Sequence, residues 1–146
     1  PPPPVQAEDG IRDEASCLVG SEMCIRDRSG RFLLSLIFIV SGFGKITAYS
    51  GTQAYMDSMG VPGALLPAVI ILEVLGGLAI TLGWKTRVTA FLLAGFSILS
   101  AALFHANFGD QMQTIMFMKN LAIAGGFLGL VASGPGSWAL DNRARA

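Results

Sequence analysis

Five polar residues stand inside or at the ends of long apolar stretches of this 146-residue chain: Lys45, Glu73, His105, Lys119 and Asn120. Because an ionisable group is costly to bury in an apolar segment, such a position suggests a functional group. A carboxylate could accept a proton, an ammonium group could neutralise it, and an imidazole could relay protons near neutral pH. Together these residue types suit a polar pocket for protons or for a small redox-active molecule such as a quinone.

The same residues also allow a purely structural interpretation. Glu73 could pair with Lys119 or with Lys45, and a neutralised Glu73–Lys119 pair would lock two helices together. Lys45 could extend its stem toward the surface, and His105 could be interfacial. We expect no metal site, because one histidine and one glutamate provide too few ligands. Nucleic-acid binding is not supported either, because the chain has no basic stripe.

The composition indicates that a membrane holds these residues in place. Hydrophobic residues make up 52% of the chain and charged residues 14%, whereas about 25% are charged in soluble proteins. Four segments reach the roughly 20 mostly apolar residues that a membrane helix needs, and the third has no charged face toward water. We therefore predict an all-α membrane protein with a four-helix antiparallel bundle, its helices at about residues 31–48, 64–82, 88–106 and 113–132.

The basic residues predict the orientation of this bundle. They precede the first segment, separate the second from the third and follow the fourth: Arg31, Lys85, Arg87, Arg143 and Arg145. The other two connections, residues 49–63 and 107–112, contain only acidic charges. Since basic residues favour the cytoplasmic side, both termini should be cytoplasmic and the polar cluster should lie in the outer half of the bundle.

Glycines recur within the apolar segments, where their small size lets helices approach closely. No strand precedes them, so they do not form a phosphate-binding loop. We expect six of them to lie at helix contacts: Gly42, Gly44, Gly76, Gly77, Gly125 and Gly126.

The first 28 residues differ in character from the rest. They are acidic, contain both cysteines (Cys17 and Cys24) and show no sustained helical or strand period. Their segments "EDGIRD" and "MCIRDR" resemble one translated frame of a transposon-end adapter used in sequencing libraries. We therefore expect residues 1–28 to be a disordered, non-native leader, with the membrane domain at 29–146 and native residues missing before about Ser29.

The membrane domain resembles the DoxX family of small bacterial membrane proteins. The resemblance lies in the order and spacing of "RFLLSLIFIVSGFGK", "MGVPG", "LEVLGGLAITLGWKTR", "FHANF", "MFMKNLAIAGGFLGL" and "GPGSWALD". It implies four spans and recurring polar positions at Lys45, Glu73, His105, Lys119, Asn120 and Asp141. One branch of the family is linked to a thiosulfate:quinone oxidoreductase as a membrane subunit, and others to complexes that handle thiol and oxidative stress.

These observations favour a multi-pass protein of the bacterial inner membrane. We expect the protein to be a small component of a redox or stress-related complex in the lipid bilayer, with quinone as a candidate ligand. Its partner would be a soluble or membrane redox protein. It would act as an accessory subunit of an oxidoreductase rather than as an enzyme alone. The alternatives are a non-catalytic scaffold that recruits a soluble partner and, less favoured because the spans lack inverted-repeat breaks, a small-solute transporter.

Overall fold

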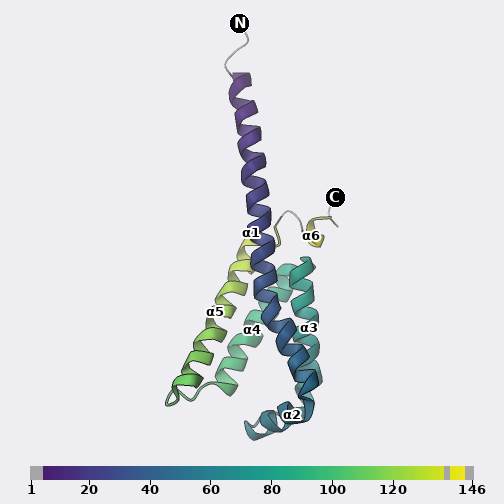
Figure 1. The fold of residues 1–146 in the computed structure, drawn as a ribbon, viewed down its shortest axis with the longest axis vertical. Helices are drawn as coiled ribbons and strands as arrows, with labels where there is room; N and C mark the ends of the chain where they lie inside the picture. The colour runs from purple at the N-terminus through teal and green to yellow at the C-terminus, as the bar shows by residue number, and fades with distance from the viewer. Residues whose placement is uncertain (1–4, 137–138, 144–146) are drawn as a thin grey trace.

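The computed structural model describes residues 5–136 and 139–143, and these form helices joined by short turns (Figure 1). Four helices are long and apolar enough to cross a membrane, which confirms the predicted four-span all-α architecture. In chain order the elements are α1 (Val5–Thr47), α2 (Tyr49–Ser58), the 3-10 turn η1 (Gly63–Leu65), α3 (Leu66–Leu82), α4 (Thr86–Phe104), α5 (Gln111–Ser133) and α6 (Leu140–Arg143).

Helix α1 is much longer than the first predicted segment. Its apolar part, Ile25–Thr47, is the candidate span, and the helix runs back from there to Val5. The division into a leader at residues 1–28 and a membrane domain at 29–146 stays a prediction, with residues 5–28 continuing α1 and residues 1–4 outside the described part. The leader contains good helix formers such as Ala, Glu and Arg, and extending an existing helix avoids the cost of nucleation. The non-native origin of the leader stays a prediction.

The boundaries of the other spanning helices follow from local chemistry. Helix α3 has a proline in its first turn and ends at Gly83, whose left-handed φ of 73° suits a residue without a Cβ. Helix α5 begins after Asp110, whose side chain accepts a hydrogen bond from the Met112 backbone N–H. These ends lie close to the predicted ones, because caps and turn residues are visible in the sequence.

Helix α4 is capped by a residue from the far end of the chain. The two carboxylate oxygens of Asp141 accept hydrogen bonds from the backbone N–H groups of Lys85 (2.6 Å) and Thr86 (2.8 Å). The Asp141 N–H donates in turn to the Gly83 carbonyl at 3.0 Å. The segment after α5 therefore returns to the α3–α4 turn and satisfies the first N–H groups of α4.

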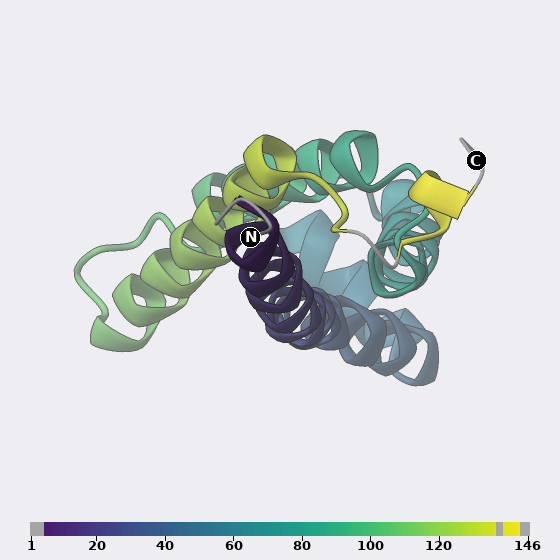
Figure 2. The same cartoon turned by 90° about the horizontal axis from the view of Figure 1, so that it is seen from above.

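The spans pack as two helical hairpins that meet along part of their length. Helix α1 packs along α3, and α4 packs along α5. Phe38 joins the two pairs, with its ring 6.3 Å from that of Phe96 and 5.4 Å from that of Phe127. Figures 1 and 2 show α1 and α5 diverging toward the end where α2 lies. The bundle is therefore closed at one end and open at the other.

The outward faces of the spans are apolar. Large hydrophobic side chains are exposed along all four, including Ile37, Leu75, Phe91 and Leu128, and most residues of each span are not buried within the chain. Because acyl chains can cover such a surface, a helix that is apolar on every face is stable in lipid but not in water.

The glycines divide into two groups. A Cβ added to Gly77 would lie 2.7 Å from Ile39 Cγ1, and one added to Gly42 would lie 2.5 Å from Val74 Cγ2, so both mark close approaches of α1 and α3. Gly76 and Gly126 face Leu93 and Leu34 in the same way. At Gly44 and Gly125 an added Cβ would meet nothing within 4 Å. The expected helix contacts at these two are therefore absent among the described residues, because both positions face outward.

These two groups predict opposite effects of adding one methyl group. We expect Gly77→Ala to lower the free energy of unfolding by about 1–3 kcal/mol, because Ile39 and the Ser35 carbonyl must move. Gly125→Ala should leave it unchanged or raise it by up to about 1 kcal/mol, because alanine favours the helix. Thermal unfolding in one detergent compares the two. Equal effects would show that α1 and α3 are not in close contact.

The orientation stays a prediction and can be tested with single cysteines. In a Cys17→Ser, Cys24→Ser background, Ser58→Cys should react with a membrane-impermeant maleimide in intact spheroplasts, and Lys85→Cys only after lysis. Both side chains are exposed, so differences in reactivity report the side of the membrane. The reverse labelling pattern would place the termini outside.

Candidate functional site

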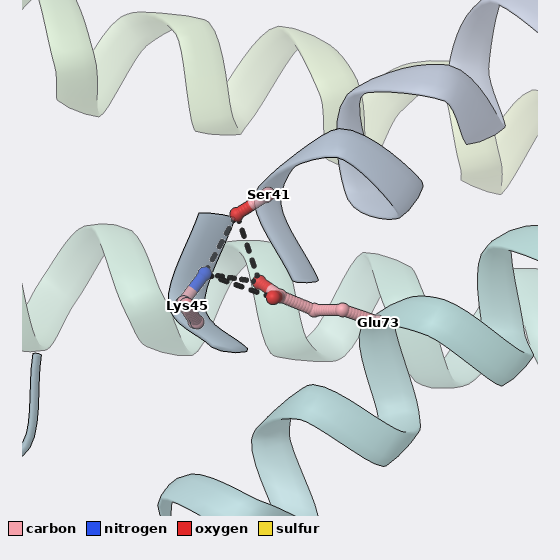
Figure 3. Close-up of polar contacts among 3 residues, drawn as sticks. All are labelled: Ser41, Lys45 and Glu73. Atoms are coloured by element: carbon pink, nitrogen blue, oxygen red, sulfur yellow. Dashed lines mark hydrogen bonds and ion pairs between the residues drawn. The ribbon is translucent and has the colours of Figure 1, made fainter. Parts of the chain in front are cut away.

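An ion pair between Lys45 and Glu73 joins the first two spans (Figure 3). Lys45 Nζ lies 2.8 Å from both Oε1 and Oε2 of Glu73 and donates to Ser41 Oγ at 2.6 Å. Ser41 Oγ donates to Glu73 Oε1 at 3.4 Å. Ser41 and Lys45 are four residues apart on α1, so they share one face of that helix.

This pair is almost hidden from the surroundings. The Glu73 side chain is 4% exposed and that of Lys45 is 25% exposed. A buried carboxylate needs a compensating charge and hydrogen-bond donors, and Lys45 with Ser41 provides both. Gly42 packs against Val74, so the α1 backbone lies close enough to α3 for the Lys45 side chain to reach Glu73.

Of the two lysines considered as partners of Glu73, the structure places Lys45 beside it and not Lys119. Lys119 is exposed on α5, whereas its neighbour Asn120 is half-buried and faces the bundle. The depth of a residue follows from its place along the helix, but successive residues point about 100° apart around the axis. Sequence spacing therefore predicts the height of each residue along α5 but not its direction around the helix axis.

Four of the five predicted site residues line one cavity of about 280 Å³ at the open end of the bundle. Its polar lining comprises Ser41, Lys45, Thr52, Glu73, Ser100, His105 and Asn120. Its aromatic lining comprises Phe38, Tyr55, Phe96 and Phe104. All four spanning helices and α2 contribute, so a site of this composition exists only when the whole bundle is assembled.

Hydrogen bonds orient the two polar residues opposite the ion pair. His105 Nδ1 lies 2.7 Å from Gln113 Oε1. An amide oxygen only accepts hydrogen bonds, so Nδ1 donates and a neutral ring keeps Nε2 as an acceptor. Asn120 Nδ2 donates one hydrogen bond to the Met116 carbonyl at 3.1 Å, and its second amide hydrogen can donate to another acceptor. The cavity therefore combines a cation, a carboxylate, an imidazole and an amide around aromatic rings.

Helix α2 was missed by sequence reasoning, which treated residues 49–63 as a connection. Its Tyr55 ring stacks on Phe104 with centroids 5.8 Å apart, and Met56 is buried. Asp57 Oδ1 accepts from the Gly63 N–H at 2.7 Å and fixes the turn into α3. The signal that could have found α2 is the spacing of Thr52 and Met56, which puts both on the face toward the cavity.

Comparison with known proteins agrees with this architecture. A family model described as DoxX matches residues 28–106. The chain belongs to the DoxX family. The inner membrane protein YqjF of Escherichia coli K12 is 56% identical over 111 residues, which cover 76% of this chain and 85% of YqjF. The inner membrane protein YphA of the same organism is 39% identical over 120 residues, covering 77% of this chain and 86% of YphA.

A third relative is more distant. The Bacillus subtilis 168 protein named "Putative oxidoreductase CatD" is 30% identical over 64 residues, covering 44% of this chain and 48% of CatD. No solved structure matches the chain. The family, the two inner-membrane relatives and the four candidate spans identify this DoxX protein as a multi-pass protein of the inner membrane.

The ion pair predicts a characteristic pattern of stability. We expect Lys45→Met to lower the free energy of unfolding by about 2–3 kcal/mol, because it leaves Glu73 buried without a counter-charge. This is less than for a fully buried pair, because Lys45 is partly exposed. The double variant Lys45→Met, Glu73→Gln should recover part of the loss. Denaturant unfolding in detergent measures all three proteins.

Lys119→Met is the matched control for this series. It removes the same charge from an exposed position on α5 and should leave stability unchanged. A loss at Lys119 as large as at Lys45, or a double variant less stable than Lys45→Met, would contradict the pairing.

Proposed function

We propose that this DoxX protein is a membrane component of a redox complex and that its outer cavity binds the head group of a quinone. One observation carries the proposal: the Lys45–Glu73 pair lies in a cavity that also holds aromatic rings and adjoins the gap between α1 and α5. A quinone needs hydrogen-bond donors for its carbonyl oxygens, flat apolar surfaces for its ring and an exit for its tail.

The dimensions and chemistry of the cavity support this ligand class. Its volume of about 280 Å³ is near the lower end of the range of about 300–1,000 Å³ for ligand pockets and suits a single substituted ring. The second amide hydrogen of Asn120 is a donor for one ring carbonyl, and the Lys45 ammonium group can donate to the other in exchange for one of its bonds to Ser41 and Glu73. Phe38, Phe96 and Phe104 offer faces and edges against which a ring can pack.

The position of the cavity supports a ligand that comes from the bilayer. Ile37 on α1 and Ile123 on α5 line it from the two helices that diverge at this end (Figure 1). Ile37 is half exposed, so the α1 side of the cavity continues into the apolar outer surface. An isoprenoid tail could leave the cavity through this opening while the head group stays beside the ion pair.

A role within a complex would supply the electrons that reduction of a quinone requires. Reduction of a quinone to a quinol takes two electrons and two protons. His105 and Glu73 are groups that can carry protons to a bound head group, and a redox partner would supply the electrons. The relative CatD, whose printed name is that of an oxidoreductase, also favours redox chemistry.

Quinone binding can be tested with photoactivatable azidoquinone and the purified protein in nanodiscs. We expect cross-links within residues that line the cavity on α1, α2 and α4. Lys45→Gln should weaken binding about tenfold or more, because a hydrogen bond from a charged donor is lost. Lys119→Gln removes the same charge outside the cavity and should bind as the wild type does.

Each variant is assayed only in its folded, monodisperse fraction, so that instability is not read as weak binding. Cross-links spread over the lipid-facing surface, or equal effects of the two lysine substitutions, would overturn the quinone site. Such a result would favour the scaffold, in which the cavity is only a packing defect beside a structural ion pair.

A further inference from the structure

Arg31 occupies an unusual environment at the closed end of the bundle. The residue is 3% exposed, and its Nε and Nη1 atoms have no hydrogen-bond partner among the described residues. A guanidinium group carries five N–H donors and stays charged at all relevant pH values. Burial of a cation with unused donors is costly, so this position calls for an anionic partner.

Arg31 lines a second cavity, of about 850 Å³, at the opposite end of the spans from the Lys45–Glu73 pair. Arg28 and Ser29 also line it and add a positive charge and a hydroxyl group. The rest of the lining is apolar and includes Phe32, Leu82 and Leu140. Arg28, Ser29 and Arg31 all lie within the stretch that the DoxX family model matches. The cavity thus joins a polar, basic part to an apolar wall.

Among the described residues, the acidic side chains nearby do not accept hydrogen bonds from Nε or Nη1 of Arg31. Asp27 and Asp141 are the acidic groups that act on the Arg31 guanidinium, and Arg28 acts against them. Both oxygens of Asp141 already accept hydrogen bonds from the first N–H groups of α4. Lys85 and Arg87 add further positive charge at the same turn. Basic side chains therefore exceed acidic ones at this end.

The backbone holds the guanidinium group in place. A Cβ added to Gly83 would collide with Arg31 Nη1 and would come within 2.5 Å of the Ala139 Cβ. The chain thus has a glycine where the arginine and the returning C-terminal segment both approach the α3–α4 turn. A cation fixed in this way loses little side-chain entropy when it binds an anion.

We propose that this cavity binds the phosphate group of an anionic phospholipid. Arg31, with Ser29, contributes positive charge and donors to the phosphate oxygens, and Phe32, Leu82 and Leu140 pack against the upper acyl chains. Basic pockets between spanning helices are suited to anionic head groups at the cytoplasmic side. The apolar lining favours a lipid over free phosphate, which shares the same recognition chemistry but has no use for that surface.

The test measures lipid retention by native mass spectrometry of the full chain from mixed phosphatidylglycerol and phosphatidylcholine nanodiscs. We expect the wild type to retain phosphatidylglycerol in preference to phosphatidylcholine. Arg31→Gln should reduce that preference about tenfold, because hydrogen bonds to a charged group are lost. Lys119→Gln, which removes one positive charge from an exposed residue on α5 that does not line the cavity, should keep it.

A second variant and a competitor make the outcome decisive. Arg31→Lys keeps the charge but loses the planar group, and a several-fold loss of preference is expected even if Arg31→Gln does not fold. Unchanged preference in every folded Arg31 variant would overturn the site. If inorganic phosphate raises the unfolding temperature in phosphatidylcholine nanodiscs as much as phosphatidylglycerol does, the ligand is free phosphate and the lipid assignment is wrong.

Discussion

Burying the Glu73 carboxylate between two spans is the constraint on which the open end of this bundle depends. A lone charge at that depth would be too costly, so Lys45 and Ser41 on α1 must lie opposite it on α3. That requires close backbone approach, and Gly42 and Gly77 provide it. The ion pair and the glycine contacts are therefore parts of one arrangement, in which packing brings the charges together and the charges fix the helix register.

Helices α4 and α5 complete the site without taking part in the close α1–α3 contact. They pack on each other and meet the first hairpin where α3 contacts α4, as at Gly76 and Leu93, and around Phe38. Where α1 and α5 diverge, the space between the hairpins becomes the cavity that holds His105 and Asn120 opposite the ion pair. Helix α2 then covers its end. A small protein thereby obtains a ligand-sized space without a large hydrophobic core.

The two ends of the bundle handle buried charge differently. At the open end a cation and an anion from adjacent helices neutralise each other, at 2.8 Å. At the closed end the Asp141 carboxylate accepts hydrogen bonds from the N-terminus of α4. Two nitrogens of Arg31, beside a second cavity, have no hydrogen-bond partner among the described residues. The first end is thus internally balanced before any ligand binds, while the second retains positive charge available to an anion.

The sequence by itself determined the number of spans and nearly all their boundaries, because apolar length, caps and turn residues are local properties. It placed Lys45, Glu73, His105 and Asn120 at the same end, because each helix rises by a constant distance per residue. It also suggested an adapter-like leader with no period, yet residues 5–28 continue α1, because a helix already formed extends easily.

Only the tertiary structure decided which charges meet. Lys119 and Asn120 are adjacent in sequence, and the direction of each around α5 depends on how that helix packs, so Lys45 rather than Lys119 became the partner of Glu73. The same holds for the open faces of Gly44 and Gly125 and for the capping of α4 by Asp141. These features depend on rotation about helix axes and on contacts between distant segments, which local sequence patterns do not encode.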